Sequence, residues 1–189
     1  MFQRYSVVAL AALVCIGPGC DDGTSGLATP FLITDTVMVA APLPQNASLP
    51  TALDIASDFG GSVGGGRFPE FNEDADDWDF LVRVEDGQIV LVPGEAAGIP
   101  ERGSAITPPI EGETFESFRE APGQATFVRD APIAMVEGQV YSARSRIIQS
   151  SCFEFAKIEP LQVDVVEGLL ELHIVTNQNC GDPRLAPVE

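Results

Sequence analysis

The stretch WDFLVRVEDGQIVLVP, residues 78–93, carries the pattern that decides the fold. Apolar side chains recur at every second position on both sides of an Asp86-Gly87 pair: Trp78, Phe80, Val82 and Val84 before it, Ile89 and Leu91 after it. This alternation is typical of a β-strand with one buried face. Asp-Gly between two such segments favours a tight turn, because both turn residues must adopt positive φ. The stretch therefore predicts a β-hairpin.

Two further segments repeat this plan with Glu-Gly at the turn. Residues 132–148 (PIAMVEGQVYSARSRII) would turn at Glu137-Gly138, and residues 161–177 (LQVDVVEGLLELHIVTN) at Glu167-Gly168. In the second segment one face is apolar and is expected to be buried: Leu161, Val163 and Val165 before the turn, Leu170, Leu172 and Ile174 after it. The other face would meet water or a binding groove, with Gln162, Asp164, Glu171 and His173. One dry and one wet face indicates antiparallel sheet.

The rest of the chain supports an all-β body over residues 31–189. Residues 29–42 predict a first strand, whereas the pattern of residues 49–56 fits a helix or a short strand equally well. Residues 114–122 predict one helical turn that Pro122 ends. We expect a single domain, an antiparallel β-sandwich or partly closed barrel of about eight or nine strands with at most one or two short helical turns.

The charge of the chain restricts its partners. It has 28 acidic and 10 basic residues, and a formal net charge of -18 at pH 7. Such a chain repels phosphate backbones and anionic lipid head groups, which excludes nucleic acid and charge-driven membrane binding. Cations and basic partners remain compatible with it.

The N-terminus has the features of an export signal. An apolar run, residues 7–16, follows the basic Arg4 and is too short to cross a bilayer. The small residues Gly17 and Gly19 precede Cys20, which favours cleavage before Cys20 and makes residues 1–19 a signal peptide.

Cys20, followed by the polar run DDGTSG, resembles the lipid-attachment signal of bacterial lipoproteins. The resemblance implies an acylated Cys20 and a flexible tether over residues 20–30. The alternative is ordinary secretion, with Cys20 left as a free thiol or paired elsewhere.

The remaining cysteines predict a disulfide. Removal of Cys15 with the signal and acylation of Cys20 leave Cys152 and Cys180, an even pair in an oxidising compartment. Two unrelated buried thiols are a weaker interpretation. A zinc site is weaker still, because no other Cys or His lies close to either residue in the sequence.

A serine-hydrolase pattern occurs once, in GGSVG, residues 60–64. Ser62 would be the nucleophile and His173, the only histidine, the base. That chemistry needs a strand before the serine and a helix after it, but GGRFPE follows, which favours a flexible glycine loop. A glycosidase-like pair of carboxylates is equally possible by residue type, but no spacing singles one out.

The acidic stretch NEDADDWD, residues 72–79, contains the weak metal candidates Asp74, Asp76, Asp77 and Asp79. An EF-hand loop would place an acidic residue or Asn where Trp78 stands and a glycine afterwards. The stretch therefore favours a solvated loop, and we predict no metal and no cofactor. Arg144 and Arg146 form a local positive patch that would bind an anion or, more commonly, pair with acids on neighbouring strands.

The signal ending in Cys20, the hairpin turns and the closing NQNCGDPRL (residues 177–185) resemble, in plan, small exported bacterial lipoproteins without an assigned function. The resemblance implies a lipid anchor at the cell envelope, periplasmic or on the outer surface, and a β-rich body. We expect a binding or structural module with an envelope protein or glycan partner rather than an enzyme. A hydrolase using Ser62 or an acidic pair, and a calcium-stabilised adhesion module, are the alternatives.

Overall fold

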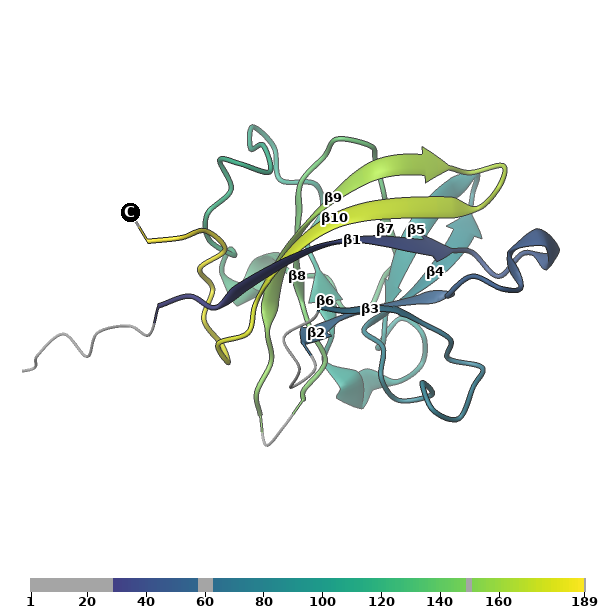
Figure 1. Ribbon diagram of the computed structural model, residues 1–189, viewed down its shortest axis with the longest axis horizontal. Helices are drawn as coiled ribbons and strands as arrows, with labels where there is room; N and C mark the ends of the chain where they lie inside the picture. The colour runs from purple at the N-terminus through teal and green to yellow at the C-terminus, as the bar shows by residue number, and fades with distance from the viewer. Residues whose placement is uncertain (1–28, 58–62, 149–150, 189) are drawn as a thin grey trace, which may run out of the picture.

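A computed structural model describes residues 29–57, 63–148 and 151–188 of the chain. These residues form two five-stranded antiparallel sheets that pack face to face and do not close into a barrel (Figure 1). The predicted all-β sandwich is confirmed. The described residues contain ten strands rather than eight or nine, because two of the strands have only two residues each. They also contain three short 3-10 helices: Pro44–Asn46, Pro100–Arg102 and Gln124–Thr126.

The first sheet has the strand order β1-β10-β9-β8-β6 and the second has β3-β2-β4-β5-β7. The strands of the first sheet are β1 (Leu32–Ala40), β10 (Leu169–Asn177), β9 (Phe155–Asp164), β8 (Tyr141–Arg144) and β6 (Ala105–Ile106). Those of the second are β3 (Val63–Arg67), β2 (Ala52–Ser57), β4 (Phe80–Glu85), β5 (Gln88–Pro93) and β7 (Ile133–Ala134). β1 confirms the first predicted strand, and β2 decides the open alternative at residues 49–56 in favour of a strand.

The hairpin predicted at Asp86-Gly87 is confirmed between β4 and β5. Glu85 pairs with Gln88, so the loop has two residues, and both have positive φ, 50° at Asp86 and 74° at Gly87. These angles are those of a type I′ turn, whose twist matches that of the strands on either side. The turn chemistry therefore fixed both the position and the register of this hairpin.

The hairpin predicted at Glu167-Gly168 is also present, between β9 and β10, but its loop is longer. Asp164 pairs with Leu169, and the Asp164 carboxylate accepts hydrogen bonds from the backbone N–H groups of Val166 (3.0 Å) and Glu167 (2.9 Å). Asp residues commonly stabilise turns in this way. Gly168 alone among the loop residues has positive φ, which excludes a two-residue turn at this place.

A β-bulge in β9 changes which residues face the core. Glu171 pairs with Gln162 but Leu172 pairs with Pro160, so Leu161 is the extra residue. Leu161 is 41% exposed, and its expected burial is wrong. Beyond the bulge the prediction holds, since Val163 and Val165 pack against the core together with Leu170, Leu172 and Ile174.

The hairpin predicted at Glu137-Gly138 is wrong. β7, before the turn, belongs to the second sheet and β8, after it, to the first, so the chain crosses between the layers here. Glu137 does not share the positive φ of Gly138. The buried Tyr141 hydroxyl instead donates to the Ala134 carbonyl (3.0 Å) and accepts from the Val136 N–H (2.9 Å), which stabilises the crossing.

The inward faces of both sheets build one apolar core. Its fully buried members include Leu53, Ile55, Phe80, Ile89, Leu91, Ile106, Tyr141, Ile158, Leu170, Leu172 and Ile174. Since a fully buried side chain of this kind contributes about 1.5–3 kcal/mol, this core is the main source of stability.

A second apolar cluster covers part of the outer face of the first sheet, which was expected to be wet. It consists of Phe115, Phe118, Ala121, Val140, Phe155, Val175 and Leu185. The turn predicted in residues 114–122 is present, with a hydrogen bond from the Phe118 N–H to the Thr114 carbonyl (3.0 Å). We call residues 114–121 the aromatic cap.

The aromatic cap encloses the only lysine and contacts the only histidine of the chain. The Lys157 ammonium donates to the carbonyls of Phe115 (2.6 Å) and Phe118 (3.2 Å) and lies 4.5 Å from the centre of the Phe115 ring. Burial lowers the pKa of Lys157 below its usual value. The His173 ring stacks on the same Phe115 ring, with 4.1 Å between centroids.

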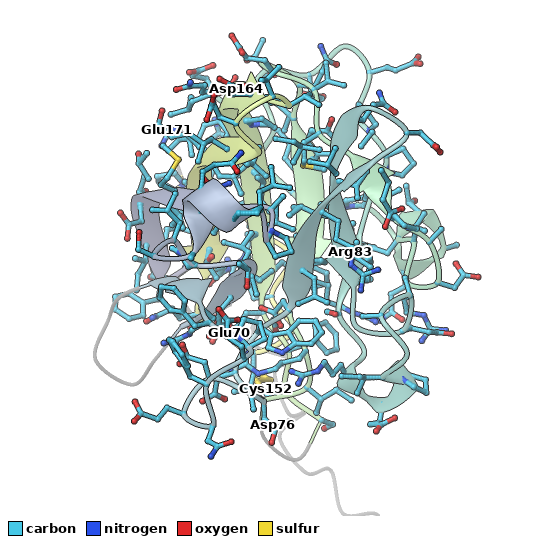
Figure 2. All side chains as sticks on the ribbon, turned by 90° about the vertical axis from the view of Figure 1, so that its right-hand side faces the viewer. Glu70, Asp76, Arg83, Cys152, Asp164 and Glu171 are labelled. Carbon is cyan, nitrogen blue, oxygen red and sulfur yellow. A yellow bond between two sulfur atoms is a disulfide. The ribbon has the colours of Figure 1, made fainter. Side chains whose placement is uncertain are left out.

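The predicted disulfide between Cys152 and Cys180 is confirmed, with 5.2 Å between the Cα atoms. It joins the loop after β8 to the segment after β10. Cys152 lies at one end of the sandwich, and Asp164, beside the β9–β10 loop, lies at the other (Figure 2). Chain-entropy models give such a link a stabilisation of about 3–4 kcal/mol.

The predicted signal peptide and most of the predicted tether, including Cys20, lie outside the described residues. Within residues 29–57, 63–148 and 151–188, no helix has the length and apolar character needed to cross a bilayer.

Candidate functional site

The serine-hydrolase candidate lacks the expected structural context. Ser62 itself lies outside the described residues, but β3 begins at Val63 directly after it. A nucleophile elbow requires a helix at that point. His173, the proposed base, stacks on Phe115 in the outer face of the first sheet.

The four acidic metal candidates lie in different environments. The Asp74 carboxylate accepts from the Phe68 N–H (2.9 Å), the Asp76 side chain is fully exposed, and the Asp79 side chain is fully buried. Asp77 is 58% exposed and pairs with Arg146 at 3.3 Å. In the part of the chain that the structure describes, no three His, Cys, Asp or Glu side chains are grouped to hold a metal ion.

The acidic stretch and the glycine-rich stretch each contribute one residue, Asp79 and Arg67, to a buried ionic cluster. We define this cluster as Asp54, Arg67, Asp79 and Arg146. The carboxylate of Asp54 accepts from Arg146 Nη1 (2.5 Å) and from Arg67 Nη2 (3.0 Å) and Nε (3.2 Å). Arg146 Nη1 also lies 3.5 Å from Asp79 Oδ1. Both carboxylates are fully buried.

Asp79 also accepts hydrogen bonds from backbone N–H groups of both sheets. One carboxylate oxygen accepts from the N–H groups of Ile55 (2.7 Å) and Ala56 (3.3 Å) in β2, and the other accepts from the Arg146 N–H (2.5 Å). Arg146 follows β8 of the first sheet, whereas Asp54 lies in β2 of the second. The ionic cluster therefore joins the two sheets.

The electrostatics of the cluster single out Asp54. Burial, and then the neighbouring charge of Asp79, raise its pKa from the usual 3.8 to about 7, against the opposing effects of Arg146 and Arg67. A strongly shifted acid is a candidate functional group. The Asp54 oxygens are occupied, however, by hydrogen bonds from Arg146, Arg67 and the Ala56 N–H, which favours a structural role.

Arg102 occupies a similar position beside the ionic cluster. Its guanidinium lies 4.0 Å from the centre of the Trp78 ring and donates to the backbone carbonyls of Ala75 (2.9 Å), Asp76 (2.8 Å) and Trp78 (2.9 Å). Its buried Nε has no partner among the described residues. Arg102 and Arg146 line a hollow of about 360 Å³, together with Asp76, Asp77, Ile99, Glu101, Ile147 and Ile148. Both guanidinium groups already donate hydrogen bonds to acceptors of the protein, which leaves them little capacity to bind a ligand in this hollow.

A second hollow is lined by two arginines that have fewer hydrogen bonds and ion pairs with the protein. We call it the arginine hollow; it has a volume of about 360 Å³ and is lined by Gln124, Ala125, Phe127, Arg129 and Arg144. Arg144 donates through Nε (3.2 Å) and Nη2 (2.6 Å) to the Gly103 carbonyl and lies 5.2 Å from the Phe153 ring centre. Burial, and then the like charge of Arg129, lower the pKa of Arg144.

The predicted positive patch of Arg144 and Arg146 is thus divided between two sites. Arg146 pairs with acids, the more common of the two expected outcomes, while Arg144 faces a second cation. Sequence reasoning missed Asp54, Arg67, Arg102 and Arg129. A signal existed for Asp54, a charged residue between the apolar Leu53 and Ile55, but none for Arg129.

No family model, curated protein or solved structure matches this chain. The structure therefore defines only a class of protein: an antiparallel two-sheet β-sandwich whose layers are joined by a buried ionic cluster.

Proposed function

We propose that this protein is an exported β-sandwich, tethered to the bacterial envelope by a lipid on Cys20, that serves as a binding or structural module rather than an enzyme. The observation that carries the proposal is the Cys152–Cys180 disulfide. Structural disulfides belong to oxidising compartments outside the cytosol. The disulfide therefore supports the interpretation of residues 1–19 as an export signal.

A tether from Cys20 is compatible with the placement of β1. Leu32 pairs with Asn177, at the end of β10 that is remote from the β9–β10 loop. The chain therefore enters the sandwich at its disulfide end. An acidic protein with a net charge of -18 gains nothing from the charge of anionic lipids, so acyl chains are the physically suited means of attachment.

The role as a module is supported by how the interior charges are used. Arg146, after β8 of the first sheet, pairs with both Asp54 and Asp79 of the second, and the disulfide joins the loop after β8 to the segment after β10. Such cross-links make a rigid scaffold, on which loops can present binding groups.

The anchor is tested by labelling expressing cells with a radioactive fatty acid. We expect the wild-type protein to incorporate label and Cys20→Ala to incorporate none, while Cys15→Ala, the matched control in the same leader region, keeps it. Equal labelling of Cys20→Ala and the wild type, or no labelling of either, would contradict the lipid anchor.

The non-enzymatic part is tested separately with a hydrolase substrate screen on the purified protein. We expect no turnover by either the wild type or Ser62→Ala. Sustained turnover that disappears in Ser62→Ala would replace the proposed module by a hydrolase.

A further inference from the structure

We propose that the arginine hollow binds a small polyhydroxy carboxylate of the sugar-acid class, with Arg129 and Arg144 holding the carboxylate. The inference rests on the binding role proposed above and names the ligand for it. Its starting point is the meeting of two guanidinium groups at a hollow in a chain that has 28 acidic residues against 10 basic ones.

The positive charge at the arginine hollow is only partly neutralised. Arg129 Nε lies 3.5 Å from a Glu95 carboxylate oxygen, in an ion pair whose side chains are 54% and 31% exposed. Such exposed pairs are weak and leave much of the cation's field in place. Arg144 has no acidic partner among the described residues and donates instead to the Gly103 carbonyl. An anion between the two guanidiniums would relieve their repulsion.

Arg144 is held in place before any ligand arrives. Two of its guanidinium nitrogens are fixed by the Gly103 carbonyl, and the group lies against the Phe153 ring. Nη1 remains as the nitrogen without a hydrogen bond to a described residue. A guanidinium fixed in this way loses little conformational entropy when it binds an anion, which favours recognition.

The other lining residues favour a sugar acid over a bare anion. Phe127 lines the hollow with an aromatic ring, which can pack against the C–H face of a sugar, and it also contacts Phe155, with 5.8 Å between centroids. Gln124 brings an amide that can both donate to and accept from hydroxyl groups. A volume of about 360 Å³ lies at the lower end of the range for ligand pockets and suits one monosaccharide.

The overall charge of the protein favours a single carboxylate over a more highly charged ligand. A net charge of -18 repels anions at long range, and the repulsion grows with the charge of the ligand. A monoanion therefore gains from the two local cations at the smallest long-range cost.

Isothermal titration calorimetry of the purified full-length protein with D-glucuronate tests the proposal. We expect one site with a Kd of about 1 mM, the scale that ligand efficiency sets for a monosaccharide. Glucose, which lacks the carboxylate, and acetate, which lacks the ring, should each bind at least about tenfold more weakly.

The matched variants are Arg129→Ala and Arg83→Ala. Both remove one exposed cation from an exposed ion pair, since Arg83 pairs with Glu85 at 3.7 Å, but Arg83 does not line the arginine hollow. We expect Arg129→Ala to weaken glucuronate binding about tenfold and Arg83→Ala to leave it unchanged.

Several results would overturn the inference. Absence of heat with glucuronate, or equal losses in Arg129→Ala and Arg83→Ala, would exclude the arginine hollow as the site. Equal or tighter binding of inorganic phosphate, lost in Arg129→Ala, would make it a general anion site instead of a sugar-acid site. Fatty-acid labelling at Cys20 shares no readout with these titrations, so failure of the anchor and failure of the ligand are distinguishable.

Discussion

Arg144 and Arg146 lie two residues apart at the end of β8, yet the structure uses them in opposite ways. Arg146 binds two fully buried carboxylates, at 2.5 Å and 3.5 Å. Arg144 has a backbone carbonyl and an aromatic ring for partners and faces the cation of Arg129. The comparison teaches that residue type and sequence neighbourhood do not decide whether a cation is structural or available to a ligand. What decides is whether the opposite sheet places acidic side chains next to the cation.

The largest expected effect comes from removing each arginine in turn. Arg146→Ala leaves Asp54 and Asp79 buried without their shared cation, and we expect it to lower the free energy of unfolding by about 3–5 kcal/mol. Arg144→Ala removes hydrogen bonds to one carbonyl and a ring contact, so a loss of about 1–2 kcal/mol is expected. Urea unfolding at pH 7 measures both. Equal losses in the two variants would remove the distinction between the two arginines.

A smaller effect is expected from two glycines, one beside each arginine site. A Cβ at Gly64 would lie 2.5 Å from the Asp54 Cγ, so Gly64→Ala should cost about 1–3 kcal/mol through overpacking of the ionic cluster. Gly123, next to Gln124 of the arginine hollow, has φ -57° and no atom within 4 Å of the corresponding Cβ position. Gly123→Ala should therefore leave stability within about 0.5 kcal/mol of the wild type. A neutral Gly64→Ala, in the same urea assay, would show that the cluster is loosely packed.

The ionic cluster should also give the free energy of unfolding a pH dependence. The pKa of Asp54 is about 7 in the folded protein and ordinarily 3.8, so between these values the folded state binds more protons than the unfolded chain. The contribution of Asp54 to stability is therefore present below about pH 4 and is lost as the pH rises to 7, by at most about 1.4 kcal/mol per pH unit.

Asp54→Asn should abolish this contribution, so its stability relative to that of the wild type should improve from pH 4 to pH 7. Asp76→Asn, at a fully exposed position near the same cluster, is the control and should follow the wild-type curve. Parallel curves for Asp54→Asn and the wild type would mean that Asp54 does not titrate in this range.

The sequence predicted those parts of the fold that depend on local chemistry. Asp86-Gly87 fixes its own hairpin, because both residues accept positive φ, and the alternation of β10 places Leu170, Leu172 and Ile174 in the core. Glu137-Gly138 has the same local pattern, but there the chain crosses between sheets and the Tyr141 hydroxyl holds the crossing. Tyr141 lies outside the turn, so the residue pattern of the turn could not predict this contact.

The candidate sites were less predictable for the same reason. Arg146 was predicted to pair with acids on neighbouring strands, but its partners come from β2 and from the residue before β4, in the other sheet. The arginine hollow brings Arg129 and Arg144 together from the two sides of the segment whose predicted hairpin at Glu137-Gly138 is wrong. Contacts of this kind depend on how the two layers are stacked.

The position of Lys157 gives the molecule a built-in chemical reporter. It is the only lysine, and its amine is enclosed by the carbonyls and ring of the aromatic cap. An amine-selective reagent can reach this side chain only when residues 114–121 lift from the sheet. The rate at which a single acetyl group is added to it under native conditions therefore measures how often that segment detaches, independently of global unfolding.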